Sequence, residues 1–143
     1  MGTRSIITFT SNGNTLVSIY QQYDGYIENG VGHKLAEWLV EKVMVNGFTP
    51  NDMRDTTKLN GAGCLVAQFI KDFKNGIGNL YIVEPNSTGE AYNYKVDIDD
   101  TRVGNVDDIT TITVTNWDEK EPIFVGKPSE LLVYKEPDEI PFT

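Results

Sequence analysis

Polar and apolar residues alternate along several stretches of this chain, and the alternation predicts strands toward both of its ends. The first two predicted strands are separated by Ser11–Asn14, in which the Asn12-Gly13 step is a strong hairpin signal because both residues tolerate positive φ. The stretches predicted as strands are 4–9, 15–23, 79–84, 90–98, 109–117 and, as a short extended piece, 122–125.

The middle of the chain instead carries apolar residues at helical spacing, which predicts a first helix over 31–45 and a second over about 62–74. The stripe of the first helix contains one polar residue, Lys42, and Asn46-Gly47 supplies a stop. A polar connection is expected over 48–60, and a short helix is expected to start at Pro128.

This order of elements predicts an α+β fold. Strands at both ends and adjacent helices between them favour an antiparallel sheet of about five or six strands, covered on one face by two α-helices. The 143 residues suit one domain over 1–143. Residues 136–143, which include two prolines, are expected to form a loosely ordered tail.

Charge and composition exclude several classes of function. The net charge is −9, and the whole excess lies in residues 72–143. No basic patch is present, so direct nucleic-acid binding is not expected. No apolar run approaches the ~18 residues of a membrane span, and the N-terminus lacks a signal-peptide core, which favours the cytoplasm. A single cysteine and a single histidine exclude an internal disulfide and a multi-histidine or cysteine-based metal site, and no cofactor is expected.

Several short motifs occur in a recognisable order over residues 1–84. They are the start Met1-Gly2-Thr3-Arg4-Ser5, the run from Ile19 to Tyr26 (IYQQYDGY), the run from Gly30 to Leu39 (GVGHKLAEWL), the run from Asn60 to Gln68 (NGAGCLVAQ) and the run from Gly76 to Tyr81 (GIGNLY). Together they resemble a family of small uncharacterised phage and prophage proteins. Two departures are Gln21, where the family pattern has a basic residue, and the segment 27–32, which lacks a Pro-containing GHG. The resemblance implies a phage context inside a host cytoplasm, and no mechanism.

Both predicted helices start behind glycines, Gly30 and Gly32 in one case and Gly61 and Gly63, after Asn60, in the other. A helix N-terminus can hold phosphate or carboxylate through its free N–H groups, and glycine lets the ligand approach closely. Two such starts facing one cleft would suit a nucleotide or cyclic dinucleotide. The alternative is that the glycines serve turn geometry or close helix packing.

The segment 20–26 concentrates side chains that can stack on a base and hydrogen-bond its edge. The candidate ligand-binding residues there are Tyr20, Gln22, Tyr23, Asp24 and Tyr26. The alternative is an ordinary strand with one buried face. Arg4 is expected beside residues 21–23, where it would bind a phosphate or pair with Asp24 as a structural ion pair.

His33 and Cys64 are the remaining candidates, each in the first turn of a predicted helix. They could form a catalytic dyad if the helix starts converge. We favour a capping or solvent-facing His33, kept neutral by the helix dipole, and a buried, structural Cys64. The acidic run 97–100 with Asp107 and Asp108 could hold calcium, but it lacks the EF-hand order and is better explained as a solvated turn.

Three functions remain in view. The first is a phage accessory binding protein, without catalysis, that counters a host defence by sequestering a nucleotide-like signal or by blocking a defence protein. The second is an acidic interaction module that binds a basic host protein, in the manner of a nucleic-acid mimic. The third is a small nucleotide-processing enzyme that uses His33, Cys64 or Asp24. A spare sheet edge also makes a homodimer plausible.

Overall fold

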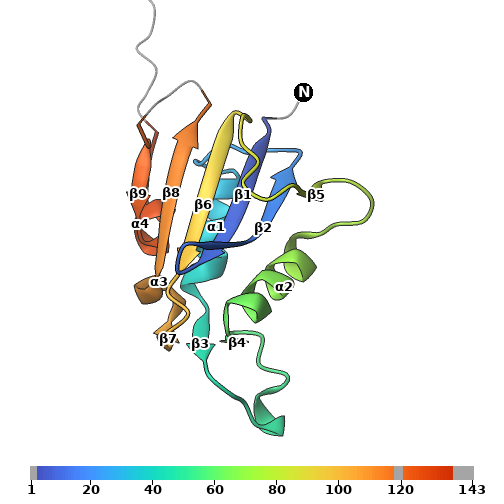
Figure 1. Cartoon of the computed structure of the whole chain (residues 1–143), viewed down its shortest axis with the longest axis vertical. Helices are drawn as coiled ribbons and strands as arrows, with labels where there is room; N and C mark the ends of the chain where they lie inside the picture. The colour runs from blue at the N-terminus through green and yellow to red at the C-terminus, as the bar shows by residue number, and fades with distance from the viewer. Residues whose placement is uncertain (1–2, 118–120, 137–143) are drawn as a thin grey trace, which may run out of the picture.

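The computed structural model describes residues 3–117 and 121–136 and builds them around a six-stranded sheet. The strand order is β5-β2-β1-β6-β8-β9, which places the first strand of the chain in the interior of the sheet (Figure 1). These strands are β1 (Ser5–Ser11), β2 (Asn14–Gln21), β5 (Leu80–Val83), β6 (Tyr92–Ile98), β8 (Thr110–Asn116) and β9 (Phe124–Gly126). Each stretch that the alternation predicts as a strand therefore contributes to this sheet.

The hairpin between β1 and β2 forms at the predicted turn. Asn12 has φ 51° and Gly13 has φ 86°, the two positive values that a tight type I′ turn requires. The strands on either side pair antiparallel, with Ser5 opposite Gln21. Local turn chemistry was therefore sufficient to place this supersecondary unit.

The predicted all-antiparallel pairing is wrong at the centre of the sheet, where β1 and β6 are parallel. After β5 the chain crosses the face of the sheet through residues 84–91 and enters again beside β1 (Figure 1). The backbone N–H of Asn86 donates to Ser18 Oγ at 2.9 Å during this crossing. Parallel neighbours need a crossover of this kind, and nothing in the sequence pattern identifies it.

The helices confirm the α+β class and correct its details. The two long helices are α1 (Val31–Val40) and α2 (Ala62–Phe73), and α4 (Pro128–Leu132) starts at the predicted proline. A further short helix, α3 (Val106–Ile109), was not predicted. Helix α4 packs against α1 and beside β8 and β9. The predicted cover of the sheet by two helices is therefore incomplete. In the described ranges no helix has the length and apolar character needed to cross a bilayer.

The first predicted helix stops five residues early, because residues 43–45 form a strand. A second sheet has the order β4-β3-β7, built from β3 (Val43–Val45), β4 (Lys58–Asn60) and β7 (Gly104–Asn105). The valines of β3 suit a strand, and parallel pairing with β4 supplies the tertiary contact that overrides helical spacing. The connection predicted over 48–60 likewise contains a 3-10 helix, η1 (Pro50–Asp52), and β4.

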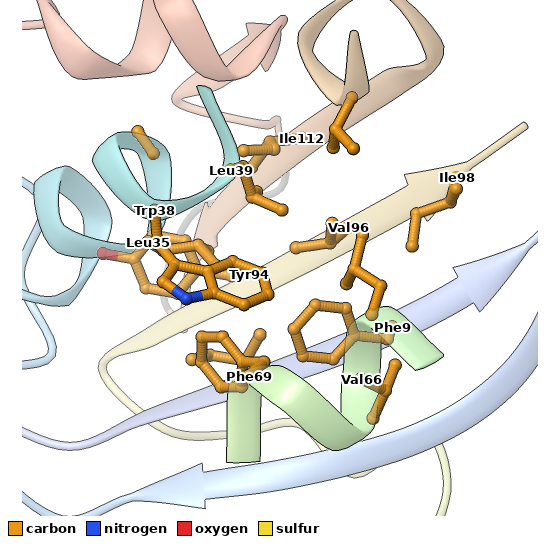
Figure 2. Packing of buried hydrophobic residues seen from close by; sticks show 14 of the residues in the cluster. Phe9, Leu35, Trp38, Leu39, Val66, Phe69, Tyr94, Val96, Ile98 and Ile112 are labelled. Atoms are coloured by element: carbon orange, nitrogen blue, oxygen red, sulfur yellow. The ribbon is translucent and has the colours of Figure 1, made fainter. Parts of the chain in front are cut away.

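Aromatic side chains join the two long helices to the sheet. The Phe69 ring of α2 lies 5.0 Å from Phe9 of β1 and 5.6 Å from Trp38 of α1, in edge-on geometries that aromatic pairs favour. Figure 2 shows these rings among the buried side chains of β6 and β8. The indole Nε1 of Trp38 donates to Asp72 at 2.8 Å, which ties α1 to α2 on the outer side. Lys42 is buried over the same indole ring, 4.7 Å from its centroid.

Truncation of Phe69 should therefore be costly. We expect Phe69→Ala to lower the free energy of unfolding by about 3–5 kcal/mol, because it leaves a cavity between three elements. Urea denaturation followed by circular dichroism measures this loss. The matched control is Phe48→Ala, at a ring that is 57% exposed, which should change stability by less than about 0.5 kcal/mol. Equal losses in the two variants would contradict this account of the core.

Candidate functional site

The start of α1 is enclosed by the chain segment that precedes it. Its first amide groups do not point to solvent, because backbone carbonyls of residues 24–27 accept their hydrogen bonds. The three bonds are Val31 N to Asp24 O (2.7 Å), Gly32 N to Tyr26 O (3.3 Å) and His33 N to Ile27 O (3.0 Å). An anion at this helix start would have to displace the protein's own acceptors.

The glycines at this helix start serve close packing. A Cβ on Gly30 would lie 2.3 Å from the carbonyl oxygen of Tyr26 and 2.6 Å from that of Asp24. A Cβ on Gly32 would lie 2.7 Å from the Cα of Ile27. Backbone cannot yield at such distances, so only glycine fits. The packing alternative for Gly30 and Gly32 therefore has direct structural support.

His33 acts as a link between segments. Its Nδ1 accepts the N–H of Asn29 at 3.2 Å, and its Nε2 lies 2.8 Å from the carbonyl oxygen of Tyr134. Acceptance at Nδ1 leaves the proton on Nε2, where it is donated to that carbonyl, so the ring is neutral. The His33 side chain therefore bonds to the segment before α1 and to the segment after α4, rather than capping the amides of α1, and both of its ring nitrogens are engaged within the protein.

The segment after α4 continues this closure. One carboxylate oxygen of Glu136 accepts the N–H groups of Ile27 (3.2 Å) and Glu28 (3.4 Å), and the other accepts the Tyr92 hydroxyl proton at 2.8 Å. Burial, and secondly this hydrogen bond, raise the pKa of Tyr92. Glu136 is the first residue of the predicted loose tail 136–143, and residues 137–143 lie outside the described residues, so that prediction stays untested.

The start of α2 is partly occupied by a side chain from elsewhere in the fold. Gly61 has φ 92°, a left-handed value that suits glycine, and a carboxylate oxygen of Asp100 accepts the N–H of Ala62 at 3.0 Å. Within the described ranges, the N–H groups of Gly63 and Cys64 bond to no other group. The Asp100 carboxylate already supplies a negative charge to this helix end, which disfavours a second anion.

The two helix starts lie at opposite ends of α1. The N–H of Gly61, just before α2, donates to Met44 Sδ at 3.1 Å, and Met44 lies beyond the far end of α1. The seven residues Lys34–Val40 of α1, about 10 Å of helix, lie between His33 and this end of α1. The common cleft, considered only as a condition for a shared site, and the Cys64–His33 dyad that depends on it are therefore not formed by these described residues. The expectation of a buried Cys64 is wrong because its side chain is exposed.

The aromatic and amide side chains of segment 20–26 bond mostly to near neighbours. The Tyr20 ring lies 5.9 Å from Tyr81 across the strand pair, and Tyr26 donates its hydroxyl proton to Asp24 at 3.0 Å. The side chain of Tyr23 is 52% exposed and remains available for contact. The ligand-binding role of these residues stays a prediction.

Arg4 lies where the hairpin register places it. Its neighbour Ser5 pairs with Gln21, so Arg4 lies beside Gln22, as expected. The Gln22 side chain accepts the N–H of Asn79 at 3.3 Å. Among the described residues Arg4 is exposed and no ion pair joins it to Asp24, so its guanidinium is free for another partner.

The α2-start pocket, defined here as the hollow between residues 46–57 and the first turns of α2, contains two of the predicted site residues. Asn60 and Cys64 line it, and its volume is about 230 Å³. Phe48 and Met53 supply apolar surface, with exposed fractions of 57% and 70%. Asp52, Asp55 and Lys58 supply its charges.

These charges form a small network with a negative excess. The Lys58 ammonium lies 2.8 Å from Asp52 and 3.9 Å from Asp55. The hydrogen bond from Lys58, followed by those from Thr49, lowers the pKa of Asp52 to about 2. Hydrogen bonds from Thr57 are the main cause that lowers the pKa of Asp55. Both carboxylates are therefore charged at neutral pH against one ammonium.

Sequence reasoning missed Phe48, Met53 and the three charged residues because they lie in a stretch predicted only as a polar connection. The sequence did contain one signal: the polar segment 48–60 includes an aromatic residue and a methionine. Such residues in a polar loop are candidates for partner contact. What the sequence lacked was the β3–β4 pairing, which brings the two ends of this loop together next to the start of α2.

The acidic residues of the second half serve mainly as internal acceptors. Asp97 accepts hydrogen bonds from Thr10 Oγ1 (2.5 Å) and Gly13 N (3.1 Å). Asp107 accepts from Ser129 N at 2.7 Å, at the start of α4. The described residues contain no cluster of three or more potential metal ligands. The acidic run therefore stabilises turns and helix starts.

Gly30, which precedes α1, and Gly63, in the first turn of α2, should respond oppositely to the same substitution. Gly30→Ala should destabilise the protein by at least about 2 kcal/mol, because its methyl group meets backbone oxygens. A Cβ on Gly63 meets nothing within 4 Å, so Gly63→Ala should be neutral or stabilise by up to about 1 kcal/mol. Thermal and urea unfolding of both variants measure this difference. A tolerated Gly30→Ala would refute the packing role.

The Asp52–Lys58 ion pair should make the stability of the protein depend on pH. Because the folded-state pKa of Asp52 is depressed, its contribution to stability is present above the unfolded value of about 3.9 and is lost as pH falls toward about 2. Lys58→Met should raise the pKa of Asp52 toward its ordinary range, which carboxyl-carbon NMR titration measures. Lys95→Met, on another part of the surface, is the control and should leave that pKa unchanged.

Comparison of the chain with protein-family models, with curated proteins and with solved structures gave no match. The resemblance to phage proteins over residues 1–84 therefore stays a prediction. Function must be inferred from the surfaces of the fold itself. Of those formed by the predicted site residues, the α2-start pocket is the one that combines a hollow, exposed apolar side chains and an unbalanced charge.

Proposed function

We propose that this chain is a binding protein without catalysis, and that it captures a basic, partly apolar segment of a protein partner in the α2-start pocket. The observation that carries this proposal is the pairing of exposed Phe48 and Met53 with the carboxylates of Asp52 and Asp55 around one hollow. Exposed apolar groups with a charged rim are typical of protein-interaction surfaces.

The chemistry of the pocket favours a lysine or arginine side chain. Both have an apolar stem that can lie on Phe48 and Met53 and a cationic head that can reach a carboxylate. The net charge of −9 attracts such a partner at long range. At about 230 Å³ the hollow is smaller than a typical ligand pocket, and it suits one side chain better than a dinucleotide.

The same geometry gives less support to the nucleotide and enzyme hypotheses. The amides at the α1 start bond to the protein's own carbonyls, and Asp100 occupies part of the α2 start. Lys58, the cation of the pocket, is already paired with Asp52. His33 has both ring nitrogens engaged far from Cys64, which removes the most reactive pair from a common site.

The resemblance to phage proteins supplies the biological context of the proposal. A small accessory protein of a phage, acting in the host cytoplasm, would have a host protein as its partner. Blocking a host defence protein is the role that agrees best with a protein-binding pocket. The idea of an acidic module that contacts a basic protein is retained, with the α2-start pocket as its contact surface.

Matched peptides test the proposal. We expect a short amidated peptide of alternating leucine and arginine to shift the NMR amide signals of residues 48–60 and 64–68, and a leucine–glutamate peptide to leave them unchanged. Phe48→Ala should weaken binding by about tenfold, because exposed aromatic residues dominate such contacts. The exposed position of Phe48 keeps this variant folded.

A charge control separates the pocket from net charge alone. Asp52→Asn with Asp55→Asn should abolish binding of the basic peptide, whereas Glu37→Gln with Glu41→Gln, which removes the same charge from α1, should not. Equal losses would reduce the effect to non-specific attraction and sink the proposal. Shifts of Gly61–Cys64 on addition of a cyclic dinucleotide, without a peptide response, would instead favour sequestering of a nucleotide.

A further inference from the structure

Strand β5 forms an open edge of the six-stranded sheet. Its one neighbour is β2, and it lies at the opposite edge from β9 (Figure 1). Within the described residues its other edge is unpaired, and its exposed side chains are large and uncharged. Tyr81 is 47% exposed and Ile82 is 71% exposed, and Ile77, just before the strand, projects fully into solvent. An apolar open edge of this kind favours pairing with another strand.

A groove of about 380 Å³ runs along this edge between β5 and α2. Ile19 and Leu80 line its floor, Ile70 of α2 and Lys74, the residue after α2, line one side, and Ile82 lies at its rim. It shares no lining residue with the α2-start pocket. The groove is thus a second apolar surface. At the adjacent edge the Leu80 N–H donates to Gly78 O at 2.7 Å and the Glu84 carbonyl accepts the Ser87 N–H at 3.1 Å, so among the described residues the outward backbone groups that remain free to pair are centred on Ile82.

We propose that two copies of this chain form a symmetric dimer through antiparallel pairing of β5 with β5, centred on Ile82. The register follows from the bonds to β2. The N–H of Gln22 donates to Asn79 O at 2.9 Å, so by antiparallel alternation residues 79, 81 and 83 bond inward. The backbone groups of Ile82 then face the free edge, where a two-fold axis brings them opposite Ile82 of the second copy.

This register also places the apolar side chains together. Ile82 lies opposite Ile19 in the β2–β5 pair, and cross-strand partners share a face of the sheet, so the Ile82 side chain lies on the α2 side. Each Ile82 would therefore enter the groove of the other copy and cover its apolar lining. A four-residue strand is short, and side-chain burial in two grooves supplements its few backbone bonds.

Charge complementarity identifies a second copy as the occupant. Glu84 directly follows the last residue of β5, so in this register it falls opposite Leu80 of the other copy, beside Lys74 at the groove. Neither Lys74 nor Glu84 has an ion-pair partner within the described residues of one copy, although the Lys74 ammonium donates to the Gly78 carbonyl and lies 5.8 Å from the centroid of the Tyr81 ring. The two-fold axis creates the Lys74–Glu84 pair twice, whereas an unrelated strand would have to supply both charges itself.

Sedimentation equilibrium of the full chain tests the dimer. We expect a dimer in the micromolar range, and Ile82→Glu, at an exposed position, should weaken it by at least about a hundredfold because it puts two carboxylates on the axis. Val125→Glu on β9, the opposite sheet edge and 61% exposed, is the control and should leave the dimer intact. A monomer throughout the range, or a dimer unaffected by Ile82→Glu, would overturn the proposal.

A charge exchange tests the register itself. Lys74→Glu and Glu84→Lys should each weaken the dimer, and the double variant should restore it, because the exchange recreates both pairs. In a Cys64→Ser background, Ile82→Cys should form a disulfide between copies on oxidation, and Val125→Cys should not. Failure of the double variant to recover, or cross-linking at position 125 instead, would exclude pairing through β5. The peptide titration of the α2-start pocket is independent of both results.

Discussion

The contact of Phe69 with Phe9 and Trp38 is the interaction on which the arrangement of the protein most depends. One ring joins α2 to the central strand of the sheet and to α1, at centroid distances of 5.0 and 5.6 Å. Because α1 and α2 are held by this contact, the chain between them must fold back at the end of the core. It does so as β3, the 46–57 segment and β4, and thereby forms the α2-start pocket.

Closure at the other end of the molecule explains why the glycine-rich start of α1 is not an open anion site. Carbonyls of residues 24–27 take the helix amides, His33 links Asn29 to Tyr134, and Glu136 bonds the same loop from the opposite side. Tyr94, buried in the core, adds a hydrogen bond to the carbonyl of Gly25 at 2.7 Å. The glycines at the start of α1 and His33, which the sequence analysis considered as binding or catalytic residues, thus stabilise a junction between distant segments.

The surfaces left open after this closure are both suited to proteins. The α2-start pocket presents apolar and acidic side chains from a loop. The β5 edge presents backbone hydrogen-bonding groups and the side chain of Ile82. A dimer through β5 would carry two α2-start pockets, and a partner with two basic segments would then gain affinity by avidity. The two proposed contacts use different parts of α2 and can operate together.

The sequence by itself determined the local structure. It specified the strands by their period of two, the Asn12-Gly13 hairpin by its tolerance of positive φ, the start of α4 by Pro128 and most of α2 by its apolar stripe. It also placed Asn60 and Cys64 correctly at a helix start. These features depend on residues close along the chain, so a pattern within one window is sufficient to predict them.

Only the tertiary structure decided the parallel pairing of β1 with β6, the end of α1 at Val40 and the assembly of the α2-start pocket. Residues 43–45 fit a helix and a strand equally well until β4 pairs with them. The role of a glycine near a helix start likewise depends on what packs against it, which is backbone at Gly30 and open space at Gly63. Such outcomes arise from contacts between residues far apart in the chain, and no local pattern of polar and apolar residues encodes them.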